Sequence, residues 1–390
     1  MAAINEPTRA RSCGDAVHAW PGRKGDIHLR LGVRRLFLIV ALALLPLVLA
    51  ACSDPMSTID PQSDHADTIQ GLYTIVFWLA AVVFVGIMVA VLALSIAFRE
   101  RPGREAQQFH SNAKLEVLWT LIPVVIVVII AVPSIAAIID INSDPPEDAL
   151  QIEVIGHQWW FEFRYPEQAG ISQEIVTANE LHLPAGRAAS FVLRSVDVIH
   201  SFWIPRLMGK TDVVPGHANT TWFTPNLGAA SEEPYLGQCA EFCGVSHANM
   251  RFRVFVDTPE DFEAWVANEL DDRVPPATEE LRAGEQLFLS SFDPVTGLSC
   301  VTCHTIQGTT ATGTIGPNLT HVGSRSTIAA GIRENTEENL IRWIENPDRE
   351  KPGVEPDLDR TVPFLSMPAW ESILEPEEIT SIAIYLTSLQ

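Results

Sequence analysis

Two groups of potential metal ligands lie about fifty residues apart in this chain, and both are rich in sulfur and imidazole. The first group comprises Cys239, Glu241, Cys243, His247 and Met250. The second is the run Cys300-Val-Thr-Cys303-His304. Soft sulfur ligands and imidazoles suit copper and haem iron, and neither group has an obvious nucleophile or acid–base pair beside it. These residue types indicate a chain that passes electrons.

The run Cys-x-x-Cys-His is the attachment pattern of c-type haem. It predicts that Cys300 and Cys303 bond the haem vinyl groups and that His304 ligates the iron. Met367 is the predicted sixth ligand, because His/Met ligation raises the potential of an electron-transfer haem, and His321 is its rival. A thioredoxin-like dithiol is the competing interpretation, but no βαβ pattern surrounds the motif.

The first group gains a second imidazole from His200, in the β-like run Asp197-Val-Ile-His-Ser-Phe-Trp203. Two thiolates, two imidazoles and a thioether form a copper-type ligand set. Two bridging thiolates could hold two copper ions that share one electron. A disulfide between Cys239 and Cys243 stays open as an alternative, since an exported domain meets oxidising conditions, and a structural zinc site is another.

Residues 1–51 have the pattern of an export signal, with Arg34 and Arg35 before the apolar run from Leu36 to Ala51. The end of this run resembles a bacterial lipobox, which predicts cleavage before Cys52 and a lipid on its thiol. A conventionally cleaved or uncleaved signal is the alternative.

Two longer apolar runs follow the signal. Thr68 to Phe98 gives 31 residues without a charge, and Val117 to Ile139 gives 23. Each is long enough to cross a bilayer, so a transmembrane hairpin is predicted over 68–139, with helices at about 70–98 and 117–139. Bases in the loop between them place that loop in the cytoplasm and the metal ligands on the outer face. These bases are Arg99, Arg101, Arg104 and Lys114.

Two further domains are expected after the hairpin. Short β-rich runs predict a sandwich or barrel over 144–270, closed by a helix with Thr258 as N-cap and Pro259 at its first position. The runs are 151–155, 159–165, 190–194, 219–224 and 251–256. Residues 271–277 read as a linker. Helical spacing at 279–289, 336–345 and 376–389 then predicts a small all-α domain over 278–390, whose thin core a haem would complete.

The chain of 390 residues is strongly acidic, with 48 acids, 26 bases and a formal charge of −22. This balance argues against binding of nucleic acid. It favours a basic protein partner, because opposite fields steer encounter.

At these residues the chain resembles subunit II of haem-copper cytochrome c oxidases, in the variant with a fused cytochrome c domain. The resemblance implies a multi-domain membrane protein with a transmembrane hairpin, a cupredoxin-like Greek-key β-sandwich and a class I cytochrome c domain. The segments that carry it, besides the 239–250 loop and the His200 run, are His110 to Thr120, Gly156-His-Gln-Trp-Trp160, Lys210 to Gly216 and Gly316 to Thr320.

The resemblance also implies roles for particular residues. The ligands of a dinuclear copper A centre would be His200, Cys239, Cys243, His247, Met250 and the backbone carbonyl of Glu241. The Glu241 side chain would face a magnesium or manganese site shared with subunit I, with Asp212 near that interface. Trp159 would couple an incoming electron to copper, unless it is only a buried aromatic of the sandwich, and Glu116 would lie near a proton path. Since all six copper positions are present, the resemblance is to the cytochrome c oxidases rather than to their quinol-oxidase relatives.

The function implied is that of the electron-input subunit of a respiratory oxidase in a bacterial cytoplasmic membrane. Electrons would come from a cytochrome c or a cytochrome bc-type complex, and subunit I, with subunit III alongside, would reduce oxygen to water. A nitric oxide reductase subunit with the same metal groups is the main alternative. A membrane-tethered copper or haem carrier and a thiol–disulfide module are further ones, although the module would have no use for His200 and Met250.

Overall fold

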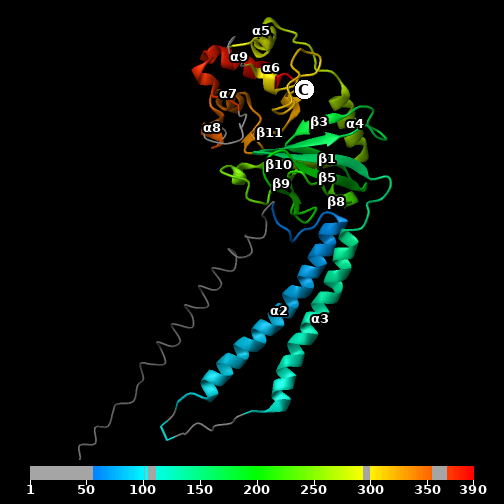
Figure 1. Cartoon of the computed structure of the whole chain (residues 1–390), viewed down its shortest axis with the longest axis vertical. Coiled ribbons are helices and arrows are strands. Elements are labelled where there is room, and N and C mark those ends of the chain that lie inside the picture. The colour runs from blue at the N-terminus through cyan, green and yellow to red at the C-terminus, as the bar shows by residue number, and fades with distance from the viewer. Residues whose placement is uncertain (1–55, 101, 104–110, 293–298, 354–366) are drawn as a thin grey trace, which may run out of the picture. The chain divides into compact units, whose positions relative to one another are not determined.

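The structure of the chain is a computed structural model, and it describes residues 56–100, 102–103, 111–292, 299–353 and 367–390. The predicted export signal, Cys52, Arg101 and Arg104 lie outside the described residues. The described part contains two long helices, a β-sandwich and a C-terminal helical domain (Figure 1). The predicted fold class is therefore confirmed.

The two long helices are α2 (Asp64–Ala97, 34 residues) and α3 (Ala113–Ile141, 29 residues). Ser63 caps α2 by accepting a hydrogen bond from the backbone N–H of Ala66, and Asn112 caps α3 in the same way. Both helices are long and apolar enough to cross a membrane, and most of their large apolar side chains are exposed. They begin a few residues before the apolar runs do, because the capping residues rather than hydropathy set their first turns.

The sandwich consists of two five-stranded sheets (Figure 1). The first has the order β3-β2-β1-β5-β8, with β1 and β5 parallel, and the second has the order β4-β10-β9-β6-β7, with β4 and β10 parallel. The strands of the first sheet are β1 (Leu150–His157), β2 (Trp160–Tyr165), β3 (Ile175–Ala178), β5 (Ala189–Ser195) and β8 (Asn219–Phe223). Those of the second are β4 (Glu180–Pro184), β6 (His200–Trp203), β7 (Thr211–Val213), β9 (Tyr235–Cys239) and β10 (Arg251–Asp257).

Aromatic side chains fill the space between the two sheets. Phe161 and Phe163 of β2 face Phe202 of β6 and Phe252 of β10, and all four are fully buried. The rings of Phe202 and Phe252 stack at a centroid separation of 5.0 Å, and Phe161 meets Phe252 edge to face at 5.1 Å. This packing fixes the two sheets against each other, so that side chains at the ends of β6 and β9 hold constant positions.

Helix α4 (Pro259–Leu270) follows β10 and packs against the sandwich. Thr258 accepts a hydrogen bond from the backbone N–H of Asp261, and Pro259 occupies the first turn, as the sequence predicts. Phe262 and Val266 are the buried residues of this helix.

The C-terminal domain is built from helices around a second apolar core. Helix α5 crosses α9, and the Cβ that an alanine would place at Gly284 of α5 would lie 2.2 Å from the backbone oxygen of Ser381 of α9. Thr278 and Thr336 cap α5 and α7. The helices are α5 (Glu279–Leu289), α6 (Cys300–Cys303), α7 (Glu337–Glu345), α8 (Pro347–Glu350) and α9 (Pro376–Thr387), accompanied by the short strands β11 (Thr327–Ile328) and β12 (Arg333–Glu334).

We predict that Gly284→Ala lowers the free energy of unfolding of the C-terminal domain by about 2 kcal/mol, because overpacking at the helix crossing outweighs the better helix propensity of alanine. Thermal unfolding of the full chain, followed by haem absorption, measures the change. Glu280→Ala, at an exposed position of the same helix, is the control. Equal stability of Gly284→Ala and the unsubstituted chain would contradict the close crossing.

Candidate metal centres

The strands of the second sheet bring the sulfur and imidazole groups together. β9 ends at Cys239 and pairs with both β6 and β10, so that Cys239 is opposite Phe202, two residues from His200. The backbone N–H of Cys239 donates to the carbonyl of Met250 at 2.9 Å, which closes the loop between the two strands. We call residues 240–250 the copper loop. Its two ends are therefore held by the sheet itself.

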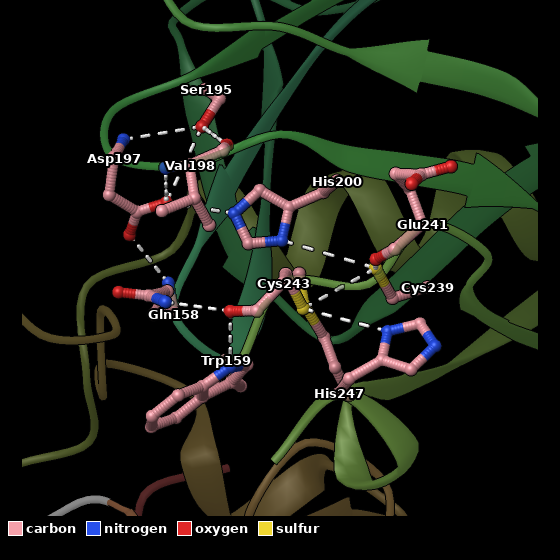
Figure 2. Close-up of polar contacts among 11 residues, drawn as sticks. Gln158, Trp159, Ser195, Asp197, Val198, His200, Cys239, Glu241, Cys243 and His247 are labelled. Atoms are coloured by element: carbon pink, nitrogen blue, oxygen red, sulfur yellow. Dashed lines mark hydrogen bonds and ion pairs between the residues drawn. The ribbon is translucent and has the colours of Figure 1, made fainter. Parts of the chain in front are cut away.

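Six donors converge at this end of the sandwich, and all except Met250 are labelled in Figure 2. His200 Nδ1 is 4.0 Å from Cys239 Sγ, and the Glu241 carbonyl oxygen is 3.2 Å from the same sulfur. Cys243 Sγ is 3.7 Å from His247 Nδ1 and 3.8 Å from Met250 Sδ. Each thiol thus has its own imidazole and a further weak donor. His200 and Met250 are fully buried, and both cysteines nearly so.

The two sulfurs of Cys239 and Cys243 are 3.7 Å apart, and both cysteines are free. A disulfide requires about 2.05 Å, so the disulfide alternative does not describe this geometry. The separation leaves both thiols facing the same space as the imidazoles. Thiolate, imidazole, thioether and carbonyl donors in such an arrangement fit copper by their chemistry.

Asp197 orients the imidazole of His200. Its Oδ1 is 2.8 Å from His200 Nε2, which leaves Nδ1 directed toward Cys239. Burial disfavours the imidazolium, but the hydrogen bonds to Asp197 and Cys239 outweigh burial and raise the pKa of His200. Metal-binding histidines are commonly held by a carboxylate in this way, which fixes the tautomer. Asp197 stands three residues before His200 in the same sequence run but was not predicted as a functional residue.

The thiols of Cys239 and Cys243 are electrostatically coupled. The hydrogen bond from Cys243, aided by His200, lowers the pKa of the Cys239 thiol, whereas the same contact and burial raise the pKa of Cys243. One thiolate is thus favoured at neutral pH, and the thiolate is the form that binds metals.

Trp159 contacts the backbone of the copper loop at Cys243 (Figure 2). Its Nε1–H donates to the carbonyl of Cys243 at 2.9 Å, and the amide of Gln158 donates to the same oxygen at 2.6 Å. The Trp159 side chain is buried, with 4% of its surface exposed. It is therefore a core aromatic of the sandwich that also hydrogen-bonds the backbone of a predicted metal ligand.

Gly156, in the Gly-His-Gln motif, leaves the space that the His200 ring occupies. A Cβ at this position would lie 2.8 Å from His200 Cδ2. Only glycine leaves room for the ring at this distance.

Three other predicted residues lie apart from the donor cluster. The Glu241 side chain and Asp212 on β7 are exposed, as is Glu116 in the first turn of α3. Asp212 is opposite Ser201 on the neighbouring strand, one residue from His200.

The second group occupies a short helix of the C-terminal domain. Cys300 and Cys303 begin and end α6, and His304 follows as its C-cap. His304 Nδ1 is 2.8 Å from the carbonyl oxygen of Pro317, to which it donates, so that Nε2 carries the free lone pair. Burial lowers the pKa of His304 and keeps the ring neutral, which is the form that ligates iron. These features fit covalent haem.

Gly313 and Gly316 allow the chain to fold tightly around this motif. A Cβ at Gly316 would lie 2.7 Å from His304 Cε1, and one at Gly313 would meet the backbone of Thr302 at 2.5 Å. Met367 is half-buried against the core of this domain. His321 is buried, and its Nε2 is 3.1 Å from the carbonyl of Asp271 in the linker.

The fold and the two sites together define a class of protein: a cupredoxin-like copper domain joined to a pair of membrane-spanning helices and to a c-type cytochrome domain. Comparison with known families agrees with this class. Residues 55–137 match the transmembrane domain of cytochrome c oxidase subunit II, residues 150–256 match its periplasmic domain, and residues 281–390 match cytochrome c.

Curated relatives extend the match over most of the chain. Cytochrome c oxidase subunit 2 of Alkalihalophilus pseudofirmus is 34% identical, over 90% of this chain and 96% of that protein. The same subunit of Bacillus subtilis is 31% identical, over 81% and 90%. Among solved structures, the periplasmic domain of subunit II of Bradyrhizobium japonicum cytochrome oxidase is 29% identical over 32% of this chain and 95% of that one, with a TM-score of 0.28. This chain belongs to the cytochrome c oxidase subunit II family, with a C-terminal cytochrome c domain, and is a component of an oxidoreductase complex.

We predict that Asp197→Ala weakens copper binding by about 10- to 100-fold, because the imidazole of His200 loses the partner that orients it. Competition with a copper chelator measures the affinity. Asp257→Ala is a matched control, since it removes a similar carboxylate–imidazole contact with His182, at 2.8 Å, elsewhere in the sandwich. An equal loss in both variants would mean that Asp197 acts only through general stability.

Proposed function

We propose that this chain is the electron-input subunit of a respiratory terminal oxidase. It would accept electrons from a cytochrome c-type donor and carry them through haem c and a dinuclear copper A centre to subunit I, where oxygen is reduced to water. The observation that carries this proposal is the convergence of two thiols, two imidazoles, a thioether and a carbonyl at one end of the sandwich.

The proposed copper ligands are His200, Cys239, Cys243, His247, Met250 and the carbonyl of Glu241. Bound copper of this kind supplies one-electron transfer with little rearrangement of its ligands. The residues contribute rigidity: β6, β9 and β10 fix His200, Cys239 and Met250 at or beside strand ends. Burial of these three residues and of Cys243 excludes water. Glu241 turns its carbonyl to the site and its carboxylate outward, an orientation that suits a magnesium or manganese site at the subunit I interface.

The proposed haem ligands are Cys300 and Cys303 for covalent attachment, and His304 and Met367 for the iron. The hydrogen bond from His304 Nδ1 to the Pro317 carbonyl leaves Nε2 as the ring nitrogen with a free lone pair. Met367 is half-buried against the core of this domain, whereas His321 has its Nε2 within hydrogen-bond distance of the linker carbonyl of Asp271 and only its buried Nδ1 without a hydrogen-bond partner among the described residues.

Trp159 is the proposed coupling residue between an incoming electron and the copper loop, on the strength of its hydrogen bond to the Cys243 carbonyl. Glu116 is proposed to lie near a proton path of subunit I, because it stands in the exposed first turn of α3. The proposed location is a bacterial cytoplasmic membrane with both metal domains on the periplasmic face. Subunits I and III are the proposed membrane partners, and the net charge of −22 suits a basic donor.

The oxidase assignment predicts three properties of the chain purified with its membrane partner in mild detergent. We expect a c-type haem band, a near-infrared copper band and consumption of oxygen. Cys243→Ser should abolish the near-infrared copper band and leave the c-type haem band. Nitric oxide consumption without oxygen consumption would identify the reductase alternative, and a c-type haem band without the near-infrared copper band would exclude the dinuclear site.

We predict that Met367→His lowers the reduction potential of the haem markedly, because methionine ligation raises the potential relative to a second histidine. A redox titration of the haem band measures it. His321→Gln should leave the potential unchanged. The reverse pattern, with a shift only in His321→Gln, would assign the sixth ligand to His321.

A further inference from the structure

A short turn of the C-terminal domain lies against the residue that supports the copper loop. This turn is Lys351–Gly353, which we call the docking turn. The Lys351 ammonium donates a hydrogen bond to the backbone carbonyl of Trp159, and Lys351 is 3% exposed. The hydroxyl of Ser246, within the copper loop, donates to the carbonyl of Pro352. Two hydrogen bonds thus join the domains at this point.

Gly353 brings the backbone of the docking turn onto the indole ring of Trp159. A Cβ at this position would lie 3.0 Å from Trp159 Cη2 and 3.1 Å from Val245 Cβ. The φ angle of Gly353 is +88°, in the region that favours glycine. Both the space and the backbone conformation therefore require glycine where the turn meets Trp159.

The shape of the docking turn is set within its own domain. Asn346 caps α8, and the backbone N–H of Lys351 donates to the Pro347 carbonyl at 2.8 Å. The backbone N–H of Gly353 donates to Asp348 Oδ1 at 2.6 Å. The turn is consequently a preformed surface rather than a segment that must order on contact.

A second set of contacts fixes the orientation of the C-terminal domain on the sandwich. Glu180 of β4 accepts hydrogen bonds from the backbone N–H groups of Ser326 and Thr327, at 2.8 and 3.1 Å. The Arg253 guanidinium of β10 donates to the Gly331 carbonyl at 2.9 Å. Two separate patches hold the domain, so its place does not depend on the linker alone.

These contacts form an unbroken route from the C-terminal domain to a proposed copper ligand. A Cβ added at Gly353 would lie 3.0 Å from the Trp159 ring, and the Trp159 N–H donates to the Cys243 carbonyl at 2.9 Å. We propose that the docking turn is the contact through which the fused haem domain passes electrons to Trp159 and the copper loop, with Lys351 as a positioning residue. This inference rests on the proposed function.

Two consequences follow from this assignment. A single electron moves from the reduced haem domain to the copper domain, and no bond is made or broken in the docking turn. The turn also occupies the outer edge of Trp159, so a soluble donor has to reduce haem c first and cannot use Trp159 itself.

The test uses the intact membrane complex, in which haem c is reduced by a flash of light with a photoreductant. The near-infrared copper band then reports how fast the electron arrives. We expect Lys351→Met and Gly353→Val to slow this transfer by about tenfold or more, because small displacements of the reacting groups carry large rate penalties. Copper content, haem content and haem potential should stay unchanged.

Two control variants distinguish a loss of docking from a general loss of stability in the C-terminal domain. Arg349→Met alters an exposed base of the same segment, which pairs with Glu371. Gly308→Val places a side chain at another glycine of this domain with positive φ, where the nearest atom to an added Cβ is 3.9 Å away. Both controls should transfer electrons at the rate of the unsubstituted complex.

Mixing with soluble reduced cytochrome c provides a second readout. In the unsubstituted complex, copper reduction should always follow haem c reduction. In Gly353→Val, we expect a fraction of the copper to be reduced before haem c. If both centres are present and the docking variants transfer at the normal rate, the docking proposal is wrong while the proposed function stands. If either centre is absent from the unsubstituted complex, the proposed function fails and this inference fails with it.

Discussion

The pairing of β9 between β6 and β10 is the constraint that fixes the donor cluster and closes the copper loop. It places Cys239 beside His200 on one side and closes the copper loop through the bond from Cys239 N–H to the Met250 carbonyl on the other. A shift of one residue in this register would turn Cys239 to the opposite face of the sheet. The stacked rings of Phe202 and Phe252 resist such a shift, because each is buried between the sheets.

Residue types alone predicted the donor set, because few other functions need two thiols, two imidazoles and a thioether. Short β-rich runs likewise predicted the regions of β1, β2, β5, β8 and β10. Strand β6 lies within the β-like run Asp197–Trp203, whereas β3, β4, β7 and β9 were not among the predicted runs. Each of these four strands has three to five residues, too few to show a period, and their pairing depends on the assembled sheets.

Contacts between distant parts of the chain were the least predictable features. Lys351 and Trp159 are 192 positions apart, and nothing near Lys351 in the sequence indicates that its side chain is buried. Asp197 is close to His200, yet an acid before a strand is common on protein surfaces. Both residues hold a neighbour in place rather than supply a ligand. Residues that only support a ligand are therefore harder to identify from a single sequence than the ligands themselves.

We propose that Cys239 and Cys243 would hold two coppers that share one electron. Electron paramagnetic resonance of the oxidised chain distinguishes one copper from two, because the unpaired electron couples to every copper nucleus on which it resides. We expect a hyperfine pattern from two equivalent copper nuclei, which is lost in Cys239→Ser. A pattern from a single copper nucleus, or one that survives this substitution, would contradict it.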